Sequence, residues 1–162
     1  MAELTTTDEK IAEVLGLAMA AQDATTKVES MVDDEQVASE LQQMRAEAEE
    51  TESRCTKLAD ALDGKKTAIL EKAAETKKEA KEMMSTYLGP DAEGLDGFEF
   101  LTMAEAGEVG HWEVLGKLNE QAGEDAITEL VEWALPIQER HLATARECAV
   151  KLAAEEDALS PA

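Results

Sequence analysis

The sequence predicts an all-α protein, a four-helix bundle of two antiparallel helix pairs with one additional helix in the central connection. Apolar residues recur at helical spacing along nearly the whole chain of 162 residues. Aromatic residues make up only 3% of the sequence, and with 3 prolines and 9 glycines it lacks the turn-rich composition of β-sandwiches and barrels. Because 44% of the residues are hydrophobic, one sizeable core can form, and we expect a single domain over residues 1–162.

The first antiparallel pair is predicted over residues 8–32 and 33–62. Thr6 and Glu9 have the spacing of a capping box at the start of the first helix. Asp33 or Asp34 can cap the second helix, which ends at Asp63-Gly64. The buried positions of this second helix follow alternating steps of four and three residues: Val37, Leu41, Met44, Ala48, Thr51, Cys55, Leu58 and Leu62.

The additional helix and the second pair occupy the rest of the chain. A Lys-rich helix is predicted over residues 65–88, where Gly89-Pro90 ends it. Asp96 and Glu99 can cap a helix over residues 98–122, and Gly123 separates it from the last helix, over residues 124–157. The last helix has a second seam of four and three residue steps: Ile127, Val131, Ala134, Gln138, His141, Ala145, Cys148 and Leu152.

Charge and cysteine content exclude several classes of function. The formal net charge of -22 repels nucleic-acid phosphates and anionic lipid surfaces, so neither nucleic acid nor membrane is an expected partner. The sequence shows no export signal and no long uncharged apolar stretch. Cys55 and Cys148 form no CxxC motif, and we expect both to be small core residues of a cytoplasmic protein.

Both histidines are predicted to lie on helix seams. The seam expected for residues 98–122 contains Leu101, Ala104, Glu108, His111, Leu115 and Leu118. Glu108 and His111 are three residues apart, a spacing that lets a carboxylate and an imidazole reach one metal inside a bundle. Gln138 and His141 repeat that spacing with an amide in place of the carboxylate. The two facing pairs are the strongest chemical signal in the sequence.

These residues suggest one metal ion rather than two. Glu108, His111 and His141 form a 2-His-1-carboxylate set that suits iron, zinc or manganese, with Gln138 and Glu139 as supporting or alternative ligands. The same side chains could instead form a hydrogen-bonded polar layer that specifies helix register. A homodimer could complete a pair of half-sites.

Local helix rules are broken near this layer. Gly107 and Gly110 flank Glu108, and Pro136 lies inside the last predicted helix. Such violations concentrate at functional or strained sites, although close helix packing also explains them. Trp112 and Trp133 are expected to fill the core nearby.

The second half of the chain resembles ferritin-like four-helix bundles, in particular small bacterial stress-associated ferritin-like proteins of unassigned function. The resemblance is carried by EVGHWEVLGKLNEQAGEDAITELVEWALPIQERHLATA, residues 108–145, and more weakly by EAEETESRCTKLADAL, residues 47–62. It implies a ferritin-like bundle and iron. The chain departs from a complete di-iron site, since the second helix has no histidine and Glu47, Glu50 and Glu52 flank its seam and are expected to be solvated.

The expected function is therefore that of a ferritin-like bundle protein that binds a non-haem metal ion through a partial Glu/His site, in stress or metal handling. Whether it is an enzyme stays open. The alternative is a noncatalytic helical interaction protein with a degenerate site and a structural polar layer. A third possibility is a ligand carrier that uses a small apolar pocket of the bundle.

Overall fold

The computed structural model describes residues 2–161, which form five α-helices and no β-strand. The helices are α1 (Thr6–Glu29), α2 (Glu35–Ala61), α3 (Lys66–Tyr87), α4 (Gly94–Ala122) and α5 (Asp125–Ala153). The all-α prediction is confirmed, and each of the five predicted helical segments overlaps with one helix.

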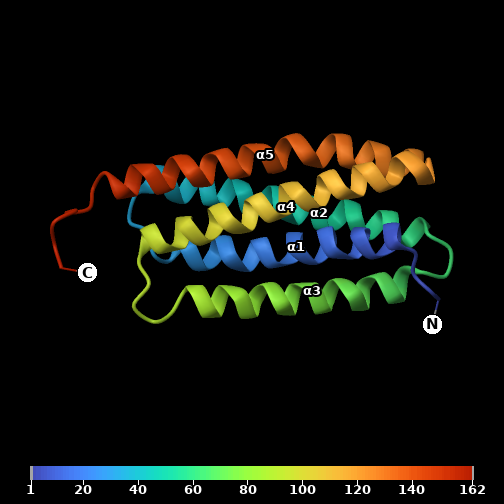
Figure 1. Ribbon diagram of the computed structural model, residues 1–162, viewed down its shortest axis with the longest axis horizontal. Helices are drawn as coiled ribbons and strands as arrows, with labels where there is room; N and C mark the ends of the chain where they lie inside the picture. Colours follow the sequence, from blue (N-terminus) through green and yellow to red (C-terminus); the bar gives the residue numbers. More distant parts are fainter. Residues whose placement is uncertain (1, 162) are drawn as a thin grey trace.

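The helices lie side by side along one long axis, and each runs opposite to the one before it (Figure 1). Helix α1 contacts α2, α3 and α4, while α5 contacts α4 and α2. The helices α1, α2, α5 and α4 therefore surround one common interior. Helix α3 packs along the outside of α1, parallel to it, and returns the chain to the end where α4 begins (Figure 1).

The helix ends are fixed by caps that lie close to the predicted ones. The capping box of α1 uses Thr5 and Asp8, one residue before the predicted pair, and Asp34 caps α2 as predicted. Helix α4 begins at Gly94, four residues before its predicted start, because the backbone of Glu93 bonds to the Asp96 carboxylate. The last helix ends at Ala153, four residues before its predicted end.

The core consists of two apolar clusters, one toward each end of the bundle. The first contains Ile11, Leu15, Cys55, Trp112, Leu115 and Ala134, among others. The second contains Ala24, Leu41, Met44, Phe98, Leu101 and Ala145, among others. Between the two, each of α2, α4 and α5 contributes at least one buried polar side chain: Thr51, Glu105, Glu108, Gln138 and His141. A polar layer thus divides an otherwise apolar interior.

The two cysteines and two tryptophans help to fill this interior. Cys55 and Cys148 are buried and unpaired, as expected of small core residues. Trp112 is fully buried. Trp133 is half-buried against the first cluster, and the guanidinium of Arg54 lies 4.1 Å from its ring centre. Pro136 is accommodated within α5 and lies on its exposed side.

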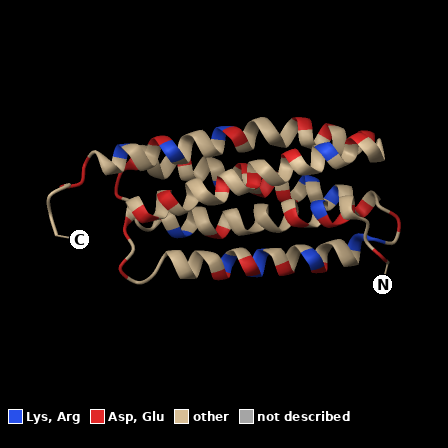
Figure 2. Ribbon diagram, in the orientation of Figure 1, with Lys and Arg blue, Asp and Glu red and all other residues tan. Residues whose placement is uncertain are grey.

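Acidic residues occur on every helix, and basic and acidic residues alternate along α3 (Figure 2). Among residues 2–161, no helix combines the length and the apolarity needed to cross a lipid bilayer.

Candidate functional site

The inward face of α4 differs from the predicted one at three of six positions, each of which is shifted by one residue toward the C-terminus. Its core positions are Leu101, Glu105, Glu108, Trp112, Leu115 and Asn119, which follow steps of four and three residues. The predicted positions Ala104, His111 and Leu118 are only half-buried. This rotation buries the Trp112 ring completely and brings Glu105, which the sequence analysis did not single out, into the core together with Glu108.

His111 consequently lies outside the core. Its Nδ1–H donates to the backbone carbonyl of Gly107 at 2.8 Å. Its Nε2 is 3.4 Å from Glu13 Oε2 of α1, and 40% of the side chain is exposed. The prediction that His111 faces the interior beside His141 is therefore wrong, because the phase of α4 places Trp112 there instead.

His141 lies inside the bundle, between carboxylates of two other helices. Its Nδ1 is 3.7 Å from Glu105 Oε2 on α4, and its Nε2 is 3.7 Å from Glu47 Oε1 on α2. Glu47 was expected to be solvated, but only 20% of its side chain is exposed and its Oε1 atom is buried. The guanidinium of Arg140 binds its other oxygen from the surface.

Gln138 completes this cluster, whereas Glu139 does not reach it. Gln138 lies one helical turn before His141 and donates its amide N–H to Glu105 Oε2. Glu139, the neighbouring residue, is exposed on the outer side of α5. Of the five candidate ligands, Glu108, Gln138 and His141 are thus in the polar layer, and His111 and Glu139 are not.

Burial favours the uncharged forms of Glu105, Glu108 and His141. Desolvation raises the pKa of Glu105 to about 8. Desolvation also raises the pKa of Glu108 well above its usual range, and the nearby Glu105 carboxyl adds to the effect. The pKa of His141 is lowered, mainly by burial, against the opposing attraction of Glu47. A buried acid that is neutral can donate a hydrogen bond as well as accept one.

Two atoms of the cluster lack a hydrogen-bond partner. They are His141 Nε2 and Glu47 Oε1, which are both buried and face each other across 3.7 Å. Buried polar atoms are normally paired, and an unpaired one costs about 1–3 kcal/mol. The gap between them is the least satisfied point in the polar layer.

The cluster is not a preformed metal site. No group of three or more His, Cys, Asp or Glu side chains in residues 2–161 is arranged to hold a metal ion. The separation of 3.7 Å between His141 Nε2 and Glu47 Oε1 is nevertheless close to that of two metal ligands, because two ligands about 2.1 Å from a tetrahedral metal lie roughly 3.4 Å apart.

Glu105 could have been found from the sequence, because it falls four residues after Leu101 and three before Glu108. The buried atom of Glu47 has no comparable signal, since this residue lies beside the seam of α2 and only the packing of α5 covers it.

Comparison with protein-family models, with curated proteins and with solved structures finds no match for this chain.

Proposed function

We propose that this protein binds one metal ion in the polar layer, with His141 Nε2 as the nitrogen ligand and Glu47 as the first oxygen ligand, while Glu105 orients the ring from its Nδ1 side. The supporting observation is that His141 Nε2 and Glu47 Oε1 face each other across 3.7 Å, while the Glu105 carboxyl lies 3.7 Å from Nδ1, on the other edge of the ring. In addition, Nε2 and the Glu47 oxygen have no other partner.

The chemistry of these donors fits a first-row metal ion. One imidazole with two or three carboxylates suits iron(II), zinc or manganese, and the buried position limits access of competing water. Binding at Nε2 would leave the proton of the ring on Nδ1, where the Glu105 carboxyl can accept it in a hydrogen bond. Glu108, three residues along the same helix, is the next available carboxylate.

Connectivity supports a ferritin-like arrangement as part of this proposal. The pairs α1/α2 and α4/α5 are each antiparallel, and α3 occupies the central connection (Figure 1). A role in stress or metal handling is part of this proposal on the strength of the family resemblance. The cytoplasmic location rests on the cysteine pattern, and the homodimer on the completion of two half-sites.

The test is metal uptake by the wild type and by two matched variants. Protein purified without chelator is reconstituted separately with iron(II), zinc and manganese, and metal per chain is measured by mass spectrometry. We expect about one metal per wild-type chain. His111→Ala is the control, because this is the only other histidine and it lies outside the core.

His141→Ala should abolish uptake, and His111→Ala should retain it. Absence of metal in the wild type, or equal loss in both variants, would contradict the proposal.

The bond from Gln138 to Glu105 favours a second candidate, a noncatalytic helical protein whose polar layer specifies helix register. In that case His141→Ala would lower the free energy of unfolding in the presence of chelator, and no metal would bind to the wild type.

A further inference from the structure

A cavity of about 190 Å³ lies beside the polar layer, between α1, α3 and α4. It exists because α3 and α4 both pack on α1 while scarcely contacting each other. Apolar side chains form most of its wall, including Leu17, Ala20, Ala21, Met84, Phe100 and Ala104.

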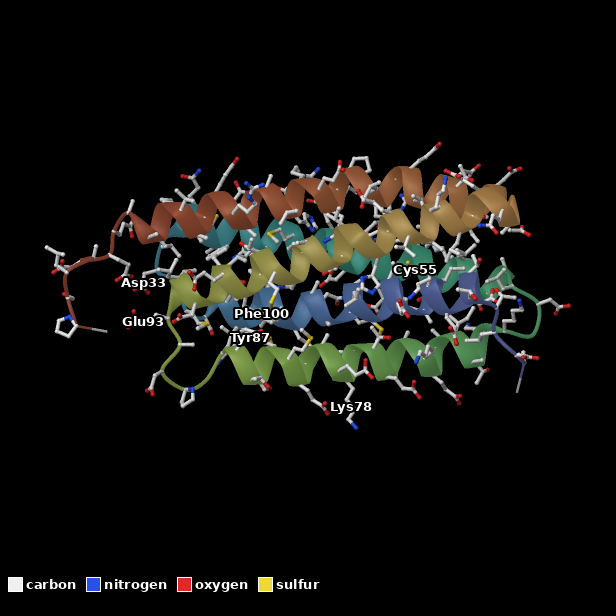
Figure 3. All side chains as sticks on the ribbon, viewed as in Figure 1. Asp33, Cys55, Lys78, Tyr87, Glu93 and Phe100 are labelled. Atoms are coloured by element: carbon white, nitrogen blue, oxygen red, sulfur yellow. The ribbon has the colours of Figure 1, made fainter. Side chains whose placement is uncertain are left out.

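The mouth of the cavity is also apolar. Met83 and Met103 line it and are 52% and 39% exposed. Tyr87, at the end of α3, extends this surface beside Phe100, with 6.1 Å between the ring centres (Figure 3).

Three acidic side chains line the cavity: Asp23, which pairs with Lys77 of α3, and the buried Glu105 and Glu108. Glu105 and Glu108 both line it and are 1% and 5% exposed. Glu105 accepts its hydrogen bond from Gln138. Glu108 has no hydrogen bond or ion pair with any side chain in residues 2–161. Neither carboxyl forms an ion pair with a Lys or Arg of residues 2–161, although Lys81 of α3 also lines the cavity. An ammonium group beside Glu108 would lower the pKa of this carboxyl, which burial raises, and would favour its ionised form.

We propose that this cavity binds a small amphipathic organic cation, an amine whose apolar body fills the space between α1, α3 and α4 and whose ammonium group faces Glu108. The size fits, because an apolar cavity of about 150 Å³ accommodates benzene. A cavity of about 190 Å³ therefore suits an aromatic ring with a short aminoalkyl chain.

The charge of the protein also favours this ligand. A net charge of -22 concentrates cations near the surface and repels anions. The apolar wall disfavours a hydrated inorganic ion but accommodates an apolar body. Metal binding by His141 is not required.

The probe is 2-phenylethylamine, with 2-phenylethanol and phenylacetate as neutral and anionic analogues of similar size. Affinity is measured by isothermal titration calorimetry on the full chain in EDTA, which removes any contribution from metal. We expect the amine to bind about tenfold or more tightly than the alcohol, and phenylacetate to bind most weakly.

Two variants test the placement of the ligand. Glu108→Gln keeps the size of the side chain and removes the carboxyl that can ionise beside an ammonium group, so it should reduce amine affinity about tenfold or more. Ala104→Leu should fill the cavity and weaken both the amine and the alcohol. Glu113→Gln is the control on the exposed face of the same helix and should bind like the wild type. Circular dichroism confirms that each variant is folded.

Equal affinity for the amine and the alcohol, or an unchanged affinity in Glu108→Gln, would overturn the assignment of the ammonium group. No binding of the amine to the folded wild type would overturn the proposed site, whatever the result of the metal experiment.

Discussion

Glu105 is nearly inaccessible to solvent, and replacing it with Gln tests the electrostatics of the polar layer. Burial raises its pKa from the ordinary value of 4.5 to about 8. Between these values the unfolded chain loses the proton and the folded chain keeps it, so the protein becomes less stable as pH rises. The contribution of protonated Glu105 to the free energy of unfolding is fully present below pH 4.5 and is lost progressively as pH rises through about 8.

The magnitude at pH 7 follows from this interval. From 4.5 to 7, at about 1.36 kcal/mol per pH unit, the cost of keeping Glu105 protonated is about 3 kcal/mol. Gln carries no charge and retains an oxygen that can accept from Gln138. Glu105→Gln should therefore raise the free energy of unfolding by about 3 kcal/mol at pH 7, and by little at pH 4.

Urea unfolding followed by far-UV circular dichroism measures this difference at pH 4 and pH 7. The control is Glu113→Gln, which removes one charge from the exposed face of α4. A variant no more stable than the wild type at pH 7 would refute the reasoning, as would a gain of the same size at pH 4 or in the control.

Four further predictions concern packing and burial. A Cβ at Gly16 would meet the backbone carbonyl of Ala73 on α3, so Gly16→Ala should lower the free energy of unfolding by about 1–3 kcal/mol in urea melts. A Cβ at Gly107 would meet no neighbouring atom, and Ala favours a helix more than Gly does. Gly107→Ala should therefore raise the free energy of unfolding by up to about 1 kcal/mol. Trp112→Ala should lower the free energy of unfolding by about 3–5 kcal/mol, since Trp112 is only 1% exposed. A smaller loss would show that the Trp112 ring does not lie in the core. Burial raises the pKa of the Cys55 thiol to about 12, so a thiol reagent should modify it only after urea unfolds the protein.

The helices were predictable from the sequence because caps and breakers mark nearly every end. Asp34 and Gly123 each have a backbone role that few other residues fill, and Gly123 adopts a positive φ of 70°. The start of α4 was predicted four residues too late, because Gly94 and Leu95 have the composition of a loop and the capping box of Glu93 was not recognised.

The phase of α4 was not predictable from hydropathy alone. The two alternative faces share Leu101, Glu108 and Leu115, and the face that is buried contains one more carboxylate, Glu105. A prediction based on the number of apolar residues therefore favours the face that is not buried. The large apolar ring of Trp112 favours the face that is buried, because this ring fills the core.

The partners of His141 depend on tertiary structure. Gln138 was recognised from its spacing to His141, but Glu47 enters the layer only because α5 packs against α2. Contacts of this kind join residues separated by more than ninety positions, and helical periodicity within one segment carries no information about them.

The most direct test of metal binding by His141 is a zinc titration followed by NMR of the two imidazole rings. The chain has only two histidines, so the His111→Ala variant assigns both sets of signals. We predict that one equivalent of zinc shifts the signals of His141 and leaves those of His111 unchanged. A response of His111 alone, or of neither ring, would contradict a metal site in the polar layer.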